Sequence, residues 1–155
     1  MPDPPRVVLH RVGADREPFL PILMEADSSE ETVRTYMHDG ELFEIRDRAM
    51  QIGAALLLRD GPTVEIKNLA LLAEHRGRGL GRASIRAVVA YARATGAREL
   101  IVGTADSEPG TMEFYRKVGF RDAGLREGFF DRYPEPVEGS GGVAHDMVMF
   151  AMDLG

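Results

Sequence analysis

The stretch EHRGRGLGRA, residues 74–83, constrains the fold most, because it sets three glycines among three arginines between two patterned segments. A strand-like segment over residues 63–72, apolar at its end, precedes it, and residues 79–95 follow with apolar side chains at helical spacing. The first N–H groups of a helix lack partners and bind anions, and glycines let a ligand approach the backbone. Arginines add charged hydrogen bonds to phosphate oxygens. The stretch therefore predicts a phosphate site where a strand meets a helix.

Two other interpretations of this stretch stay open at this point. One is a flexible, solvated turn, and the other is a nucleotide-binding α/β protein that holds a different phosphate. The stretch is not a P-loop, because no Gly-Lys-Ser/Thr follows it. It also departs from the dinucleotide fingerprint, whose third glycine would fall at Arg82.

The composition of the chain excludes several classes of protein. A formal net charge of -6 argues against broad nucleic-acid binding. The absence of cysteine excludes disulfides, cysteine zinc sites and a thiol nucleophile. The N-terminal residues lack the apolar core of a signal peptide, and no apolar run approaches the roughly 18 residues that span a bilayer. We expect one domain over residues 1–155, located in the cytoplasm, with no membrane partner.

The pattern of the whole chain predicts a mixed sheet with helices on its faces. The strands before and after residues 79–95 need a crossover and are expected to be parallel, whereas the hairpins elsewhere are antiparallel. The alternation of residues 63–72 is lost after Asn68, which predicts either a β-bulge or a strand that changes from half-exposed to fully buried. The expected elements are a strand at 7–12, helical segments at 16–27 and 28–40, strands at 41–47, 50–61 and 63–72, a helix at 79–95, a strand at 98–104, a helix at 109–120 and two strands in the tail.

Two motifs carry a family resemblance. Arg76-x-x-Gly79-x-Gly81, which follows NLALLAEH and opens a long amphipathic helix, resembles motif A of the GNAT acyltransferases, and FYRKVGF at residues 114–120 is similar to the second signature of that family. The resemblance covers residues 50–155 by sequence and the first half by architecture. It implies the GNAT fold, an α/β (α+β) class with a mixed, mostly antiparallel sheet of six to seven strands, about four helices and splayed central parallel strands.

The resemblance implies that acetyl-CoA is the co-substrate and that no metal takes part. Its pyrophosphate would lie on the glycine-arginine loop, and its pantetheine arm would pair with the backbone of the bulged strand. The N–H of Leu71 or of its neighbour would polarise the thioester carbonyl. The family often has an asparagine after the next strand, and this sequence has none there, so Thr104, Asp106 or Ser107 would take its place. The implied cofactor-binding residues are Leu69, Ala70, Leu71, Arg76, Gly77, Arg78, Gly79, Leu80, Gly81, Arg82 and Thr104.

The resemblance also implies two catalytic residues. Tyr115 stands where the family often has a tyrosine that protonates the leaving thiolate, and its alternative is a core aromatic packed with Phe114 and Phe120. Glu65 stands where several members have a glutamate base. Its alternative is an ordinary residue of a half-exposed strand, paired with Lys67 or with a cross-strand arginine.

The tail predicts an acceptor site. Phe129, Phe130 and Tyr133 would provide aromatic walls and Asp131 negative charge, which suits a small cationic amine. The four histidines are scattered without the spacing of metal ligands. The expected activity is direct acetyl transfer in a ternary complex, as in bacterial small-molecule GNAT enzymes. A non-catalytic acyl-CoA sensor and a protein or peptide N-acetyltransferase are the alternatives, and the family expectation is a homodimer.

Overall fold

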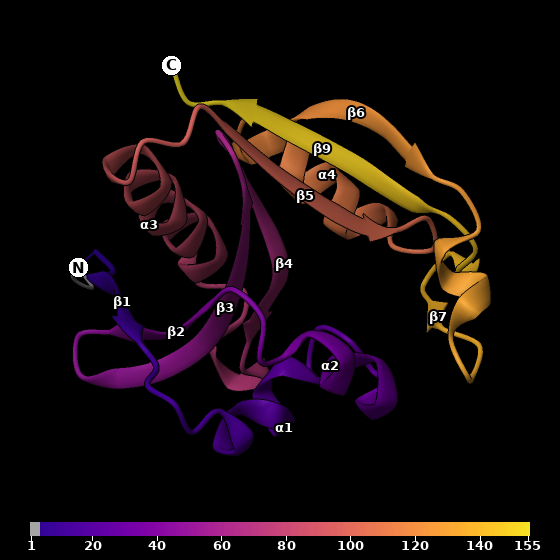
Figure 1. Cartoon of the computed structure of the whole chain (residues 1–155), viewed down its shortest axis with the longest axis horizontal. Coiled ribbons are helices and arrows are strands. Elements are labelled where there is room, and N and C mark those ends of the chain that lie inside the picture. The colour runs from indigo at the N-terminus through magenta and orange to yellow at the C-terminus, as the bar shows by residue number, and fades with distance from the viewer. Residues whose placement is uncertain (1–3) are drawn as a thin grey trace.

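The computed structural model describes residues 4–155 and forms one seven-stranded sheet and a small two-stranded one (Figure 1). The first three residues of the predicted domain lie outside this range. The elements are β1 (Val7–Arg11), η1 (Glu17–Phe19), α1 (Leu20–Leu23), α2 (Glu30–Tyr36), β2 (Glu41–Asp47), β3 (Met50–Asp60), β4 (Thr63–Leu71), η2 (Ala73–His75), α3 (Leu80–Ala94), β5 (Glu99–Ala105), α4 (Pro109–Val118), β6 (Arg121–Arg126), η3 (Phe129–Arg132), β7 (Glu138–Gly139), β8 (Gly142–Val143) and β9 (Met147–Asp153).

The large sheet has the strand order β1-β2-β3-β4-β5-β9-β6. Strands β1 to β4 form an antiparallel meander, β5 runs parallel to β4, and β9 lies antiparallel between β5 and β6. The predicted mixed, mostly antiparallel sheet with a parallel central pair is confirmed. Within the described range, no helix combines the length and the apolar character that crossing a membrane requires.

Two hydrophobic cores lie on opposite faces of this sheet. Helices α3 and α4 pack on one face, where Ile85 and Val88 join Phe150 in a fully buried cluster. Helices α1 and α2 pack on the other face, where Leu23 and Val33 cover Leu42 and its neighbours. Figure 1 shows α3 separated from α1 and α2 by the strands β2 to β4.

The helical segments before β2 are shorter than the sequence predicts. Helix α1 ends at Leu23, and the chain continues in turns whose N–H groups at residues 25–27 bond back to Ile22 and Leu23. Ser29 caps α2 by accepting a hydrogen bond from the N–H of Thr32 at 3.1 Å. These turns place Asp27 within 2.8 Å of the Tyr36 hydroxyl, which also bonds to Asn68 of β4.

The predicted bulge lies at Lys67. On β4, Ile66 pairs with Leu57 of β3 and Asn68 pairs with Leu56, so Lys67 is the extra residue. Before the bulge, Ile66 faces the α3 core, whereas after it Leu69 packs toward that core and Ala70 belongs to the α1–α2 core. One inserted residue therefore exchanges the faces of the strand.

The parallel pair separates halfway along its length. Strands β4 and β5 pair from Thr63 with Glu99 to Ile66 with Val102, and no pair between them follows. Beyond that point β4 pairs only with β3 and β5 only with β9. The two strands diverge toward the lower part of Figure 1, which confirms the predicted splay.

Candidate active site

A cavity of about 970 Å³ occupies the gap between the diverging strands. Its lining comes from the turns after α1, from β4 beyond the bulge, from the loop that opens α3, from the end of β5, from α4 and from the segment around η3. The sequence-predicted residues that line it are Leu69, Ala70, Leu71, Arg76, Gly77, Gly79, Gly81, Arg82, Thr104, Tyr115, Phe129, Phe130 and Tyr133. The candidate residues outside this lining are Glu65, Arg78, Leu80 and Asp131.

The loop before α3 has the backbone of an anion site. Gly77 and Gly79 have φ values of 79° and 75°, in the left-handed region, and they alternate with arginines. A Cβ on either glycine would meet nothing within 4 Å, so the space above them is open. Helix α3 begins at Leu80 with no acidic residue in its first turn. Successive N–H groups of alternating hand form a concave donor set that suits phosphate oxygens.

Gly81, in the same segment, allows close packing between the start of α3 and α4. A Cβ at this position would lie 3.2 Å from the ring of Phe114 on α4. The missing side chain lets the start of α3 approach α4 closely, and both elements line the cavity.

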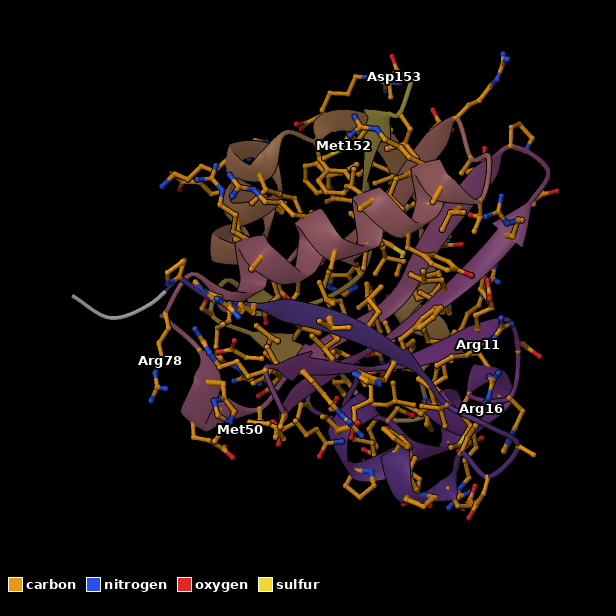
Figure 2. The ribbon with its side chains drawn as sticks, turned by 90° about the vertical axis from the view of Figure 1, so that its left-hand side faces the viewer. Arg11, Arg16, Met50, Arg78, Met152 and Asp153 are labelled. Atoms are coloured by element: carbon orange, nitrogen blue, oxygen red, sulfur yellow. The ribbon has the colours of Figure 1, made fainter. Side chains whose placement is uncertain are left out.

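The three arginines of the loop differ in direction. Arg76 donates to the Leu71 carbonyl at 3.1 Å and pairs with Glu25 at 3.4 Å, and Arg82 donates to the Lys117 carbonyl at 3.3 Å. Both line the cavity. Arg78 extends away from the ribbon into solvent (Figure 2), and Leu80 is buried in the α3 core.

Tyr115 belongs to the core and to the cavity wall at once. Its ring lies 5.5 Å from that of Phe120 and 5.7 Å from that of Phe150, between ring centroids. Burial raises the pKa of Tyr115 to about 12. The phenol therefore stays protonated at neutral pH and keeps a hydrogen to donate.

Glu65 lies on β4 before the bulge. Its carboxylate is 3.0 Å from the guanidinium of Arg126 on β6, and its side chain is 17% exposed. The alternative interpretation of Glu65, an ordinary strand residue paired with a cross-strand arginine, predicted such an ion pair. Glu65 is not part of the cavity lining, although its neighbour Ile66 is.

Three aromatic rings gather at the far end of the cavity. Phe130 lies 5.0 Å from Phe129 and 5.2 Å from Tyr133, between ring centroids. The Asp131 carboxylate is instead 2.9 Å from Nδ1 of His145. That hydrogen bond raises the pKa of the His145 imidazole, because the carboxylate stabilises the imidazolium.

The sequence analysis missed a carboxylate beside these rings. Asp27 lines the cavity and accepts hydrogen bonds from the hydroxyls of Tyr36 at 2.8 Å and Tyr133 at 3.1 Å. Burial and the nearby Asp27 raise the pKa of both tyrosines, so both phenols stay protonated. Asn68 donates from Nδ2 to the Tyr36 hydroxyl and to the Leu23 carbonyl, each at 3.0 Å. No local sequence pattern predicts this cluster, because Asp27 and Tyr133 are 106 residues apart in the chain.

The sequence matches the model of the acetyltransferase (GNAT) family over residues 14–120. It is 31% identical over 135 residues to the uncharacterized N-acetyltransferase YvbK of Bacillus subtilis, covering 86% of this chain and 87% of that protein. It spans only 39% and 50% of two mammalian N-acetyltransferases that it also matches.

Two solved structures are similar along almost the whole chain. A GNAT family acetyltransferase from Elizabethkingia anophelis with acetyl-CoA bound has a TM-score of 0.87 and 32% identity, over 95% of this chain and 97% of that one. An IAA acetyltransferase from Bacillus cereus has a TM-score of 0.86 and 31% identity, over 96% and 99% of the two chains.

Proposed function

The chain belongs to the acetyltransferase (GNAT) family and is an acyltransferase, and we propose that it transfers the acetyl group of acetyl-CoA directly to the primary amine of a small cationic molecule. The observation that carries this proposal is the single cavity that joins the glycine-arginine loop, Tyr115 and the Asp27 cluster. The bound acetyl-CoA of the Elizabethkingia structure, at 32% identity, supports the choice of acyl donor. A cytoplasmic location and a homodimer stay predictions.

The residues of the loop and of β4 bind the donor in this proposal. The N–H groups around Gly77 and Gly79 and the guanidinium groups of Arg76 and Arg82 bind the pyrophosphate. The backbone of residues 69–71, which has no partner on β5, pairs with the pantetheine arm as an added strand would. Thr104 faces this arm from β5, and the N–H of Leu71 polarises the thioester carbonyl.

The reaction then needs proton movements at two atoms. The acceptor ammonium loses a proton to a base, its lone pair attacks the carbonyl carbon and the C–N bond forms. The C–S bond then breaks as the nitrogen loses its second proton, so that the products are a neutral amide and, once the thiolate takes up a proton, a thiol. Tyr115 donates a hydrogen bond to the leaving sulfur. A thiol has a pKa near 8.5, well below that of Tyr115, so the phenol stabilises the thiolate mainly as a hydrogen-bond donor. Without a cysteine, no thioester of the enzyme itself forms on the way.

The acceptor end of the cavity suits a protonated amine. Phe129, Phe130 and Tyr133 provide faces for cation–π contact, and Asp27 provides the negative charge inside the cavity. Asp131 adds negative charge on the outer side of η3, where it is already paired with His145.

Calorimetric titration with acetyl-CoA, followed by a thiol-release assay with a panel of amines, tests the proposed function. We expect acetyl-CoA to bind, CoA to compete with it, and ATP and NAD not to compete. Thiol release should depend on an amine. Absence of acetyl-CoA binding would contradict the phosphate site, and binding without any turnover would favour the sensor alternative.

Glu65→Gln tests the base. If Glu65 takes the proton of the ammonium through a water molecule, the fall in rate on the acidic side of the pH profile should disappear in this variant, and the rate should be low throughout. The measurement is kcat/KM against pH. Glu113→Gln is the matched control, since Glu113 pairs with Lys117 on the outside of α4. If the acidic limb persists in Glu65→Gln and is lost in Asp27→Asn, Asp27 is the base instead.

A further inference from the structure

Lys67, the bulge residue of β4, places an ammonium group in the wall of the acceptor end. Its Nζ lies 4.9 Å from the ring centroid of Tyr36 and 5.3 Å from that of Phe129. The residue lines the cavity. It is one of only two lysines in a chain whose other basic residues are arginines or histidines. Because the bulge breaks the alternation, Lys67 and its neighbour Asn68 both contact Tyr36.

This ammonium has no carboxylate partner among residues 4–155. The Lys67 ammonium lies over the rings of Tyr36 and Phe129. The nearby Asp27 does not pair with it, and that carboxylate instead accepts from two phenols and from the N–H of Ser29 at 3.3 Å. Aromatic faces hold a cation but do not neutralise it. The cavity wall therefore presents a cation that is not ion-paired among the described residues and can bind an anionic group of a ligand.

The same end of the cavity also presents acceptors for an ammonium. Asp27 has oxygen lone pairs beyond the three hydrogen bonds it accepts. Oδ1 of Asn68 is buried without a hydrogen-bond partner in the described part of the chain. Its amide orientation is fixed, because the Leu23 carbonyl can only accept and so requires Nδ2. A buried acceptor without a donor is costly, and a ligand N–H removes that cost.

We propose that the amine acceptor of this enzyme is zwitterionic, a primary amine that also carries a carboxylate, with its ammonium at Asp27 and Asn68 and its carboxylate at Lys67. The class is that of amino acids. The inference rests on the proposed acetyl transfer to a primary amine and replaces a purely cationic acceptor with a zwitterionic one, because the second cation of a polyamine would be repelled by Lys67. The rings of Phe129, Phe130 and Tyr133 then cover the apolar part of the acceptor.

Matched acceptors test this inference. The standard amino acids, their carboxamides and spermidine are compared by thiol release from acetyl-CoA with the full chain. The carboxylate and the carboxamide of one amino acid share the amine and the side chain, so their kcat/KM ratio isolates the anionic group. We expect the best acceptors to be carboxylates, preferred over their carboxamides by ~10- to 100-fold, as for one charged hydrogen bond.

Substitutions of Lys67 test whether this side chain causes the preference for carboxylate acceptors. Lys67→Met should abolish the preference for the carboxylate while the carboxamide reacts nearly as before, and Lys67→Arg should keep part of the preference. Lys117→Met, at the other lysine, is the control; that side chain is 72% exposed and pairs with Glu113 on α4. Equal melting temperatures of the variants exclude a folding defect.

Three outcomes would overturn the proposal. The first is that the best acceptors carry no anionic group, and the second is that Lys67→Met leaves the ratio of carboxylate to carboxamide unchanged. In both cases acetyl transfer itself would still stand. The third is that no amine releases thiol although acetyl-CoA binds, in which case the proposed function fails and this inference fails with it.

Discussion

Tyr115→Phe is expected to lower kcat by about 10²- to 10³-fold, as removal of one donor to a developing anion does in other enzymes. The substitution removes only the hydroxyl. The ring contacts with Phe114, Phe120 and Phe150 stay, so the core and the cavity wall should keep their shape. The affinity for acetyl-CoA should change little, because the phosphate site lies on another element.

Steady-state thiol release and calorimetric titration together check this expectation. Tyr91→Phe is the matched control, since the Tyr91 hydroxyl bonds to Glu41 at 2.6 Å and the residue does not line the cavity. Full activity of Tyr115→Phe would make Tyr115 a packing residue only. A loss of acetyl-CoA affinity equal to the loss of rate would show that the hydroxyl acts in binding.

The double substitution Arg76→Ala and Arg82→Ala should weaken acetyl-CoA binding by about 3 kcal/mol or more, roughly 100-fold in Kd, since each charged hydrogen bond contributes about 1.5–3 kcal/mol. These are the two loop arginines that line the cavity. The effect should shrink at high salt, because ions screen exposed charges. Calorimetric titration at two salt concentrations measures both quantities.

Arg86→Ala is the control for this pair, because Arg86 is exposed on α3 outside the cavity lining. The melting temperature needs to be followed as well, since Arg76 also bonds to Leu71 and Glu25 within the protein. An unchanged Kd in a folded double variant would place the phosphates elsewhere on the molecule.

Local patterns were enough to predict most of the fold. The helix from Leu80 to Ala94 and the strand from Glu41 to Asp47 follow directly from their periodicities, and Gly96 and Gly119 mark the ends of α3 and α4. The bulge was predicted because one inserted residue disturbs the alternation of β4. The small hairpin of β7 and β8 and the turn of η3 were not predicted, because their short segments carry no periodicity.

Only the part of the site that is formed by one continuous segment of the chain could be predicted from the sequence. The glycine-arginine loop is one continuous segment, so its role as a donor set could be inferred from composition and position. Side-chain direction could not, because it depends on the conformation of the loop: Arg78 precedes α3 and extends into solvent, whereas Arg82 lies in the first turn of α3 and lines the cavity. The pairs Asp27–Tyr133 and Glu65–Arg126 join distant segments, and only the folded sheet brings them together.

The bulge at Lys67 also gives β4 one position that neither hydrophobic core uses. If Lys67 were deleted, Asn68 would follow Ile66 directly, and regular alternation would leave Leu69 and Ala70 on the faces where they lie now. The cores on the two sides of the sheet therefore do not depend on the residue at this position. We expect acceptor preference to change by substitution at Lys67 without loss of core packing.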